Sequence, residues 1–362
     1  MIDLVPLIDA LGENGAALAG GAALGLLFGI AAQRSAFCTR SAVIGLMTGE
    51  RRAAAIWLAG FATAVLGVQW LLWNGTVDVT ETRFFSTAQS LSGALIGGGL
   101  FGLGMVLARG CVSRHMVLAA SGNIRALVTL AFIAVTGLAT YSGLLVPARD
   151  SIGGLWSTAA IGGNDLLAHG GLTQGAGVVI GLALAAGALA LAVTARASLW
   201  RLAGGIAVGL AIVGGWYFTY DLSLQVFEPI QAESLSFIRP LATTGELATG
   251  ASDGFGLDQG VLIGALAGAF LAALAFRDFR FAGFGDAGAA AAWRYPLGGV
   301  LMGFGGILAV GCTIGAGFTG GAVLAVSSLA GLAAMVGSAA LAHAIIDAPA
   351  RVAVRPAAAP AE

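Results

Sequence analysis

The sequence contains three cysteines, Cys38, Cys111 and Cys312, each at the end of a run of small and apolar residues. As neutral thiols they are weak hydrogen-bond donors and polarizable contacts, which suits reversible contact with a sulfur atom. As thiolates they would be nucleophiles, and a neighbouring arginine or helix N-terminus favours that form. A single buried cysteine is most often a small packing residue, and three cysteines in apolar surroundings do not make a disulfide framework. The positions of the cysteines in the sequence are therefore needed to distinguish a packing role from a chemical one.

Arginines flank two of the three cysteines. Arg34 and Arg40 lie on either side of the first, and Arg109 and Arg114 lie on either side of the second. The planar donors of arginine suit an oxyanion, and the amides at the start of a helix add the positive end of its dipole. The third cysteine has no charged neighbour, so we expect Thr313 and the glycine-rich amides after it to serve there.

The glycine-rich segment before Cys111 is repeated before Cys312. When the two cysteines are aligned, eight of the preceding positions are identical, including Gly110 opposite Gly311. A weaker copy precedes the first cysteine, and a fourth copy ends in Phe218 where a cysteine is expected. Small residues let membrane helices pack closely, which explains the glycines but not the sulfurs. Recurrence at one repeat position therefore favours a functional role for the cysteines.

The composition is that of an all-α polytopic membrane protein. Hydrophobic residues make up 58% of the 362 residues, charged residues only 10%, and the mean hydropathy is +0.92. This leaves too little polar surface for a soluble globule, and apolar runs of about 20 residues recur along the chain. We predict about nine transmembrane helices, at roughly 15–33, 53–73, 91–108, 124–146, 173–195, 200–218, 257–276, 296–311 and 327–347.

The basic residues orient these spans. All seventeen are arginines, and an outside N-terminus with a cytoplasmic C-terminus leaves only Arg83, Arg149 and Arg239 outside. The positive-inside rule favours this orientation. The same rule offers another role for the arginines beside the cysteines, as anchors at the cytoplasmic rim. Charge inside a membrane is expensive, however, so we expect Arg109, two residues before a cysteine, to be functional.

Each copy of the repeat predicts a glycine-rich span, a short break after the cysteine position, a half-length helix and a second span. Two spans return the chain to its starting side, and the single extra span then flips the second pair of copies. We expect two halves of inverted topology, with re-entrant half-helices entering from opposite faces and lining a pathway. The predicted divisions are an N-terminal extracytoplasmic segment at 1–14, a first half at 15–146, a connecting span within 147–199, a second half at 200–347 and a cytoplasmic tail at 348–362.

The motifs "SAFCTR", "LARGC" and "LAVGCTIG", in this four-copy layout, resemble the YeeE/YedE family of sulfur transporters. The resemblance covers about residues 15 to 347. It implies an hourglass of nine spans with short inward-dipping helices, and a narrow centre lined by Cys38, Cys111 and Cys312. It also implies uptake of thiosulfate across a bacterial inner membrane. Some relatives are associated with selenium, so selenium or other sulfur species remain alternative substrates.

Other functional classes remain open beside transport. A membrane sulfurtransferase would cleave the substrate's S–S bond and hold a cysteine persulfide, and a non-transporting scaffold would bind a cytoplasmic sulfur-carrier protein. We expect a transporter rather than an enzyme, with a sulfur oxyanion, the lipid bilayer and such a carrier as partners. No cofactor or metal is expected, because His115, His169 and His343 make no metal-ligand spacing and are interpreted as solvated or packing residues. A net charge of −1 without a basic run argues against nucleic acid.

Overall fold

The computed structural model describes residues 3–227, 230–250, 254–286 and 290–347. Every regular element in these ranges is a helix, and nine helical segments are long and apolar enough to cross a membrane. The predicted all-α membrane fold with about nine spans is therefore confirmed. The helices that belong to the predicted first half are α1 (Val5–Ser35), α2 (Thr39–Thr48), α3 (Arg52–Trp73), α4 (Leu91–Leu107), α5 (Val112–Ala120) and α6 (Ile124–Tyr141). They are followed by α7 (Val146–Gly153), η1 (Thr158–Ile161), α8 (Leu166–His169) and α9 (Gln174–Thr194), and then by α10 (Leu199–Ser223), α11 (Ile238–Thr249), α12 (Leu257–Ala275), α13 (Arg294–Leu308), η2 (Thr313–Gly320), α14 (Val326–Ala342) and η3 (His343–Asp347).

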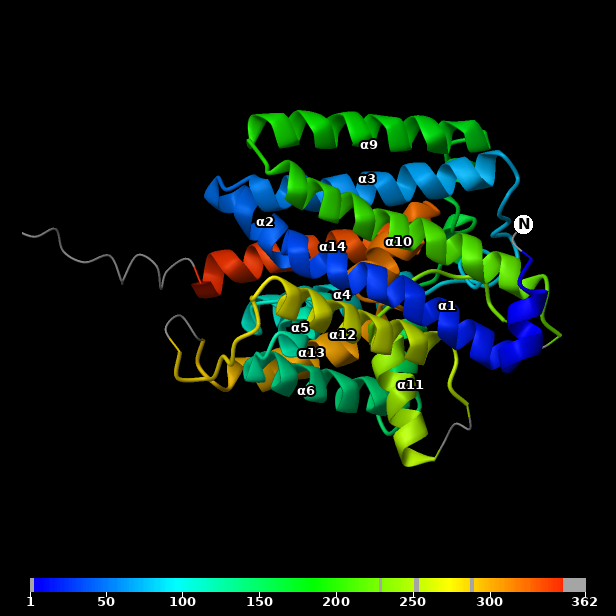
Figure 1. Ribbon diagram of the computed structural model, residues 1–362. Coiled ribbons are helices and arrows are strands. Elements are labelled where there is room, and N and C mark those ends of the chain that lie inside the picture. Colours follow the sequence, from blue (N-terminus) through cyan, green and yellow to red (C-terminus); the bar gives the residue numbers. More distant parts are fainter. Residues whose placement is uncertain (1–2, 228–229, 251–253, 287–289, 348–362) are drawn as a thin grey trace, which may run out of the picture.

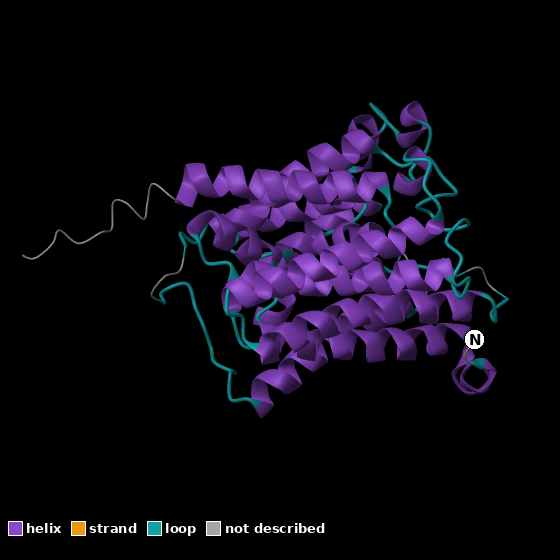
Figure 2. Cartoon of the chain, turned by 90° about the horizontal axis from the view of Figure 1, so that it is seen from above, coloured by secondary structure: helices purple, strands orange, loops and turns teal. Residues whose placement is uncertain are grey.

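The long helices lie side by side, and most connecting loops gather at the two ends of the bundle (Figures 1 and 2). At one end Asp347 pairs with Arg40 and Arg294, and we name it the Asp347 end. At the other end the buried amide of Asn164 donates to the carbonyl of Phe84, and we name it the Asn164 end. Helix α9 forms an outer edge of the bundle, where it packs on α3 (Figure 1).

Glycines set the close approach of α4 and α13. A Cβ on Gly97 would lie 2.5 Å from the carbonyl oxygen of Gly305, and one on Gly104 would lie 2.7 Å from the carbonyl oxygen of Gly298. Backbone therefore touches backbone, as in the small-residue interfaces of membrane helices. Residue numbers rise along one helix as they fall along the other, so α4 and α13 run antiparallel.

The corresponding first helices of the two halves, α1 and α10, also run antiparallel. Gly20 on α1 faces the ring of Phe218 on α10, whereas Ser35 at the end of α1 faces Gly204 near the start of α10. Each of these two helices has a parallel neighbour in the opposite half. Helix α1 packs along α12, and α3 packs along α10.

The break expected after Phe218 is absent. Helix α10 continues through Phe218 to Ser223, and the short helix of the third unit, α11, begins only at Ile238. In the second and fourth units the chain turns at the two residues before the cysteine, but here those positions hold Trp216 and Tyr217. The indole of Trp216 is fully buried and donates to the carbonyl of Thr319 at 3.2 Å, a contact that ties helical α10 to η2 at this position. The residue directly before the short helix is Phe237, which is fully buried.

Candidate functional site

The three cysteines share one backbone arrangement. Each is the residue directly before a short helix, and the residue two positions earlier has a positive φ: Ala36 (54°), Arg109 (63°) and Val310 (55°). Non-glycine residues seldom adopt this left-handed conformation, which costs on the order of 1–3 kcal/mol. Three such turns at matching repeat positions indicate that the fold holds each cysteine at a fixed point. The arginine before the second cysteine is not needed for the turn, since alanine and valine make the same one.

Two of the cysteines meet in the core. The side chains of Cys38 and Cys111 lie close enough to interact, and both are almost completely buried. Serine hydroxyls complete the surroundings: Ser41 contacts Cys38, and the hydroxyl of Ser113 lies 3.4 Å from the sulfur of Cys111. The fold thus places two weak sulfur donors side by side in an apolar interior.

Cys312 stands apart from this pair. Helix α4 ends before Cys111 and α13 ends before Cys312, so the antiparallel packing of the two helices sets these cysteines toward opposite ends of the pair. Cys312 is fully buried, and the next residue, Thr313, carries a buried hydroxyl without a hydrogen-bond partner. A buried polar group without a partner costs about 1–3 kcal/mol. A hydroxyl in this state beside a thiol is equipped to bind a passing polar ligand.

Aromatic rings connect η2 to the segment around the first cysteine. The ring of Phe318 on η2 makes edge-to-face contacts with Phe37, Trp57 and Phe61, at centroid distances of 5.5, 5.2 and 5.4 Å. Such pairs add about 0.5–1.5 kcal/mol each beyond area burial. On the side of the Asn164 end, Thr319 donates to the carbonyl of Leu235 at 2.6 Å. These contacts fix η2 on both sides within the bundle.

Of the four predicted arginines, Arg114 and Arg40 interact electrostatically with Cys38. The Nη1 of Arg114 is buried without a hydrogen-bond partner. Arg34 is instead engaged at the end of α12. It forms an ion pair of 3.2 Å with Asp278 and stacks over the ring of Phe276 at 3.6 Å. Its contacts match the anchoring role that was the alternative for these arginines.

Arg40 and Arg109 also belong to a cluster of charged residues at the Asp347 end. Arg40 forms an ion pair of 3.2 Å with Asp347, and Arg294 pairs with the same carboxylate at 2.8 Å. Arg109 interacts electrostatically with both Arg40 and Asp347, and it is exposed rather than enclosed by the bundle. The sequence did not single out Arg294 or Asp347, because neither lies near a cysteine in the chain.

The glycines before the cysteines are required by packing. A Cβ on Gly311 would lie 2.9 Å from the carbonyl carbon of Gly315, in the first turn of η2. A Cβ on Gly110 would lie 2.9 Å from Cε1 of His115. The imidazole of His115 is buried, with Nδ1 at 2.9 Å from the carbonyl oxygen of Cys111 and Nε2 at 3.1 Å from that of Ala108.

His115 therefore spans the break in its own unit and holds both of its edges. From the sequence we interpret His115 as a solvated or packing residue. The structure shows that it is buried and that it also holds the backbone on both sides of the break. The signal that could have revealed this role is the spacing of Cys111 and His115, which places the imidazole one helical turn beyond the cysteine.

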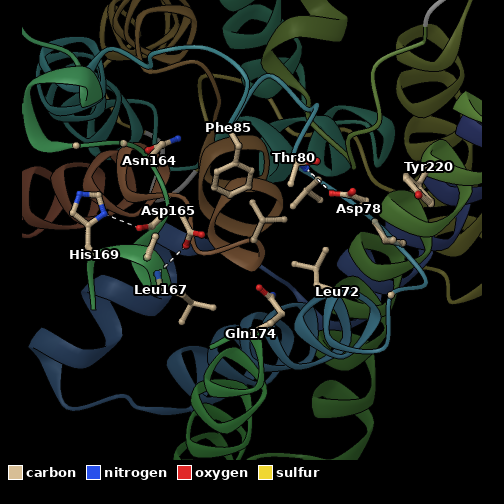
Figure 3. A pocket seen from close by; sticks show the side chains of 17 residues that line it. Leu72, Asp78, Thr80, Phe85, Asn164, Asp165, Leu167, His169, Gln174 and Tyr220 are labelled. Carbon is tan, nitrogen blue, oxygen red and sulfur yellow. Dashed lines mark hydrogen bonds between the residues drawn. The ribbon is translucent and has the colours of Figure 1, made fainter. Parts of the chain in front are cut away.

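Two cavities open at opposite ends of the bundle. A cavity of about 790 Å³ at the Asn164 end lies against Val323, just beyond η2, and is lined by Gln174, Tyr220 and His169 (Figure 3). A cavity of about 450 Å³ is lined by Arg40 and other residues of α2. Cys38 directly precedes α2, which lines the smaller cavity, and Cys312 directly precedes η2, which ends shortly before Val323 at the larger cavity.

Comparison with known families decides the class of protein. A family model described as sulphur transport matches residues 34–341, and this range includes all three cysteines. The chain belongs to the sulphur transport family. This confirms the family resemblance found in the three cysteine motifs. A search of the curated proteins found no match to this member of the sulphur transport family.

Proposed function

We propose that this protein takes up thiosulfate into the cytoplasm of a bacterium, with Cys38, Cys111 and Cys312 as successive contact points. The observation that carries the proposal is that the buried thiols of Cys38 and Cys111 lie close enough to interact, together with the Arg114 guanidinium, which interacts electrostatically with Cys38 and has a buried Nη1 without a hydrogen-bond partner. Neutral thiols donate weakly and are polarizable, which suits the terminal sulfur of thiosulfate. The guanidinium suits its oxygens. Weak contacts also let the ion leave again, which conduction requires.

The proposed path begins in the cavity at the Asn164 end. From there the ion passes η2 to Cys312 and Thr313, continues to the thiol pair, and leaves by the cavity beside Arg40. The arginines support this orientation of the protein in the membrane, because most of them lie at the end that we take as cytoplasmic. Membership of the sulphur transport family supports sulfur as the element that is carried.

The packing of the long helices supports an inverted repeat as the frame of this path. Helices α1 and α10, and likewise α4 and α13, occupy matching places in the two halves and run antiparallel. Two halves of opposite orientation would present their breaks to opposite sides of a membrane. In this proposal the short helices α2 and α5 face the cytoplasm, and α11 and η2 face the outside.

A second candidate function is a membrane sulfurtransferase. The adjacency of Cys38 and Cys111 favours it, because one thiolate could attack the terminal sulfur of thiosulfate while the other stands ready to accept that sulfur. The attack would form a cysteine persulfide and release sulfite as the leaving group. Mass spectrometry of purified protein after exposure to thiosulfate distinguishes the two functions. A stable gain of one sulfur atom on either cysteine would favour the enzyme.

Growth of a bacterial strain that depends on imported thiosulfate tests the transport proposal. We expect the wild type to restore growth and Arg114→Gln to restore it poorly, since the substitution removes the charge beside the thiol pair. Arg201→Gln is the matched control, because Arg201 is an exposed arginine at the start of α10. Full rescue by Arg114→Gln at equal expression would contradict a role for this arginine.

A further inference from the structure

Three guanidinium groups surround one carboxylate at the Asp347 end. Arg40 on α2 and Arg294 on α13 both pair with Asp347, and Arg109 interacts electrostatically with the same carboxylate. The arginines come from three different repeat units, so the tertiary fold assembles the cluster. Positive charge exceeds negative charge within it.

Several buried polar atoms in this cluster have no hydrogen-bond partner. The Nε atoms of Arg40 and Arg294 are buried without a hydrogen-bond partner. The imidazole of His343 is only 3% exposed, and its Nδ1 faces Oδ2 of Asp347 at 3.6 Å, which is too long for a hydrogen bond. Each buried donor without an acceptor costs about 1–3 kcal/mol. A single carboxylate therefore does not satisfy the donors gathered around it.

The cluster borders open space close to the thiol pair. The cavity of about 450 Å³ is lined by Arg40, Ser41, Thr48 and Glu50, and Arg40 follows Cys38 by two residues. Glu50 is exposed at the margin of this cavity. Even when its charge is counted, the three guanidinium groups outnumber the carboxylates. A ligand for this place is therefore an anion with several acceptor oxygens.

We propose that this cluster is a second binding site for a divalent sulfur oxyanion, which displaces the carboxylate of Asp347 from Arg40 and Arg294. The identity of the oxyanion as thiosulfate rests on the proposed function. The binding site itself rests on the charge excess, the unsatisfied donors and the cavity. Guanidinium groups bind tetrahedral oxyanions through paired hydrogen bonds. Because Asp347 can return when the ion departs, the exchange keeps the arginines compensated and favours release.

Anion binding to purified, detergent-solubilised protein tests the site without requiring transport. The readout is the rise in apparent melting temperature with sodium sulfate or sodium thiosulfate, against sodium chloride at the same ionic strength. We expect both divalent anions to protect the wild type. We expect Arg294→Gln to weaken this binding by roughly tenfold, and Arg294→Lys, which keeps the charge but not the paired donors, to weaken it less. Asp347→Asn removes the competing carboxylate and should tighten binding several-fold.

The control is Arg201→Gln, which should leave sulfate protection unchanged. Sulfate affinity equal to that of the wild type in folded Arg294→Gln and Asp347→Asn proteins would overturn the site. Protection by thiosulfate alone that survives Arg294→Gln would also overturn it, since binding would then belong to the thiols. The two proposals can fail separately. Arg294-dependent sulfate binding without thiosulfate uptake would refute only the transport proposal, and uptake without such binding would refute only this site.

Discussion

The thiol of Cys38 lies close enough to interact with the thiol of Cys111, although the two residues precede different short helices in different repeat units. Cys312, in the fourth unit, stands toward the other end of the antiparallel pair of α4 and α13. Two of the three cysteine sulfurs therefore lie together and the third, that of Cys312, lies apart from them. The third repeat unit contributes no sulfur. We infer that the thiols act at successive points on an asymmetric path rather than as a ring of equivalent ligands.

The third unit offers a direct comparison of two phenylalanines. Phe237 stands directly before α11, and its buried ring packs on Phe28 at a centroid distance of 4.7 Å. We expect Phe237→Cys to lower the free energy of unfolding by about 3 kcal/mol, because it leaves a cavity in the core. Phe218→Cys, on a half-buried face of α10, should keep uptake within a few-fold of the wild type. Thermal denaturation and thiosulfate uptake of both variants check this, and a strong gain of uptake in either would contradict the asymmetric path.

The two glycines before cysteines should respond differently to the same substitution. In Gly311→Ala the new Cβ meets the backbone of η2, which cannot move away without unwinding the turn. In Gly110→Ala it meets the imidazole of His115, which can shift. Overpacking typically costs about 1–3 kcal/mol, and we expect Gly311→Ala to lie at or above the upper end and Gly110→Ala at the lower end. Apparent melting temperatures of the two purified variants would reveal the order, and the reverse order would contradict this packing.

A buried carboxylate near the Asn164 end should govern stability in acid. Glu233 pairs with Arg83 at 2.8 Å and with Arg239, which also binds Asp258. Burial by itself raises the pKa of Glu233, but the two guanidinium groups outweigh it and hold that pKa below its usual value. The ionised pair therefore stabilises the fold above the ordinary glutamate pKa, and this contribution is lost as pH falls through the lowered pKa.

We expect Glu233→Gln to cost about 2 kcal/mol at neutral pH, below the range for fully buried pairs because both arginines are partly exposed. The matched control is Asp150→Asn, which breaks an exposed ion pair and should cost at most about 1 kcal/mol. Thermal denaturation from neutral to acidic pH measures both. The stability difference between wild type and Glu233→Gln should shrink as the pH falls. A stability difference that grew as the pH fell would contradict this prediction.

The histidine at the cavity of the Asn164 end should produce the opposite pH dependence. One ring nitrogen of His169 lies 2.6 Å from the carbonyl oxygen of Asp165 (Figure 3). The other lies 2.8 Å from the carbonyl oxygen of Ile161, and the two contacts raise the pKa of His169. Protonated His169 donates to both, so its contribution is present below the ordinary histidine pKa and is lost as pH rises through the raised one. We expect wild type to exceed His169→Gln in melting temperature at about pH 6 and to match it at about pH 8. A constant difference at both pH values would show that protonation is not involved.

The sequence predicted the features that depend on composition and local repetition. Apolar run lengths gave nine spans, and matching glycines revealed that the segments around Cys111 and Cys312 are copies. The same alignment placed the break of the third unit wrongly at Phe218, because the tertiary contact of Trp216 with η2 leaves no pattern in the repeat. The sequence alignment could not predict contacts between residues of different repeat units. Neither the pairing of Cys38 with Cys111 nor the sharing of Asp347 by several arginines leaves a pattern in one chain.

Uptake of labelled thiosulfate into proteoliposomes that contain the purified protein tests the central claim most directly. We expect Cys111→Ala and Cys312→Ala each to lose more than about tenfold in initial rate, a change of about 1.4 kcal/mol or more in the transport barrier. Ser121→Ala removes a similar polar atom from a buried position at the end of α5 and should stay within a few-fold of the wild type. Either cysteine variant carrying thiosulfate at the wild-type rate, while folded to the same extent, would contradict the account, and the repeated cysteine would then be a packing residue.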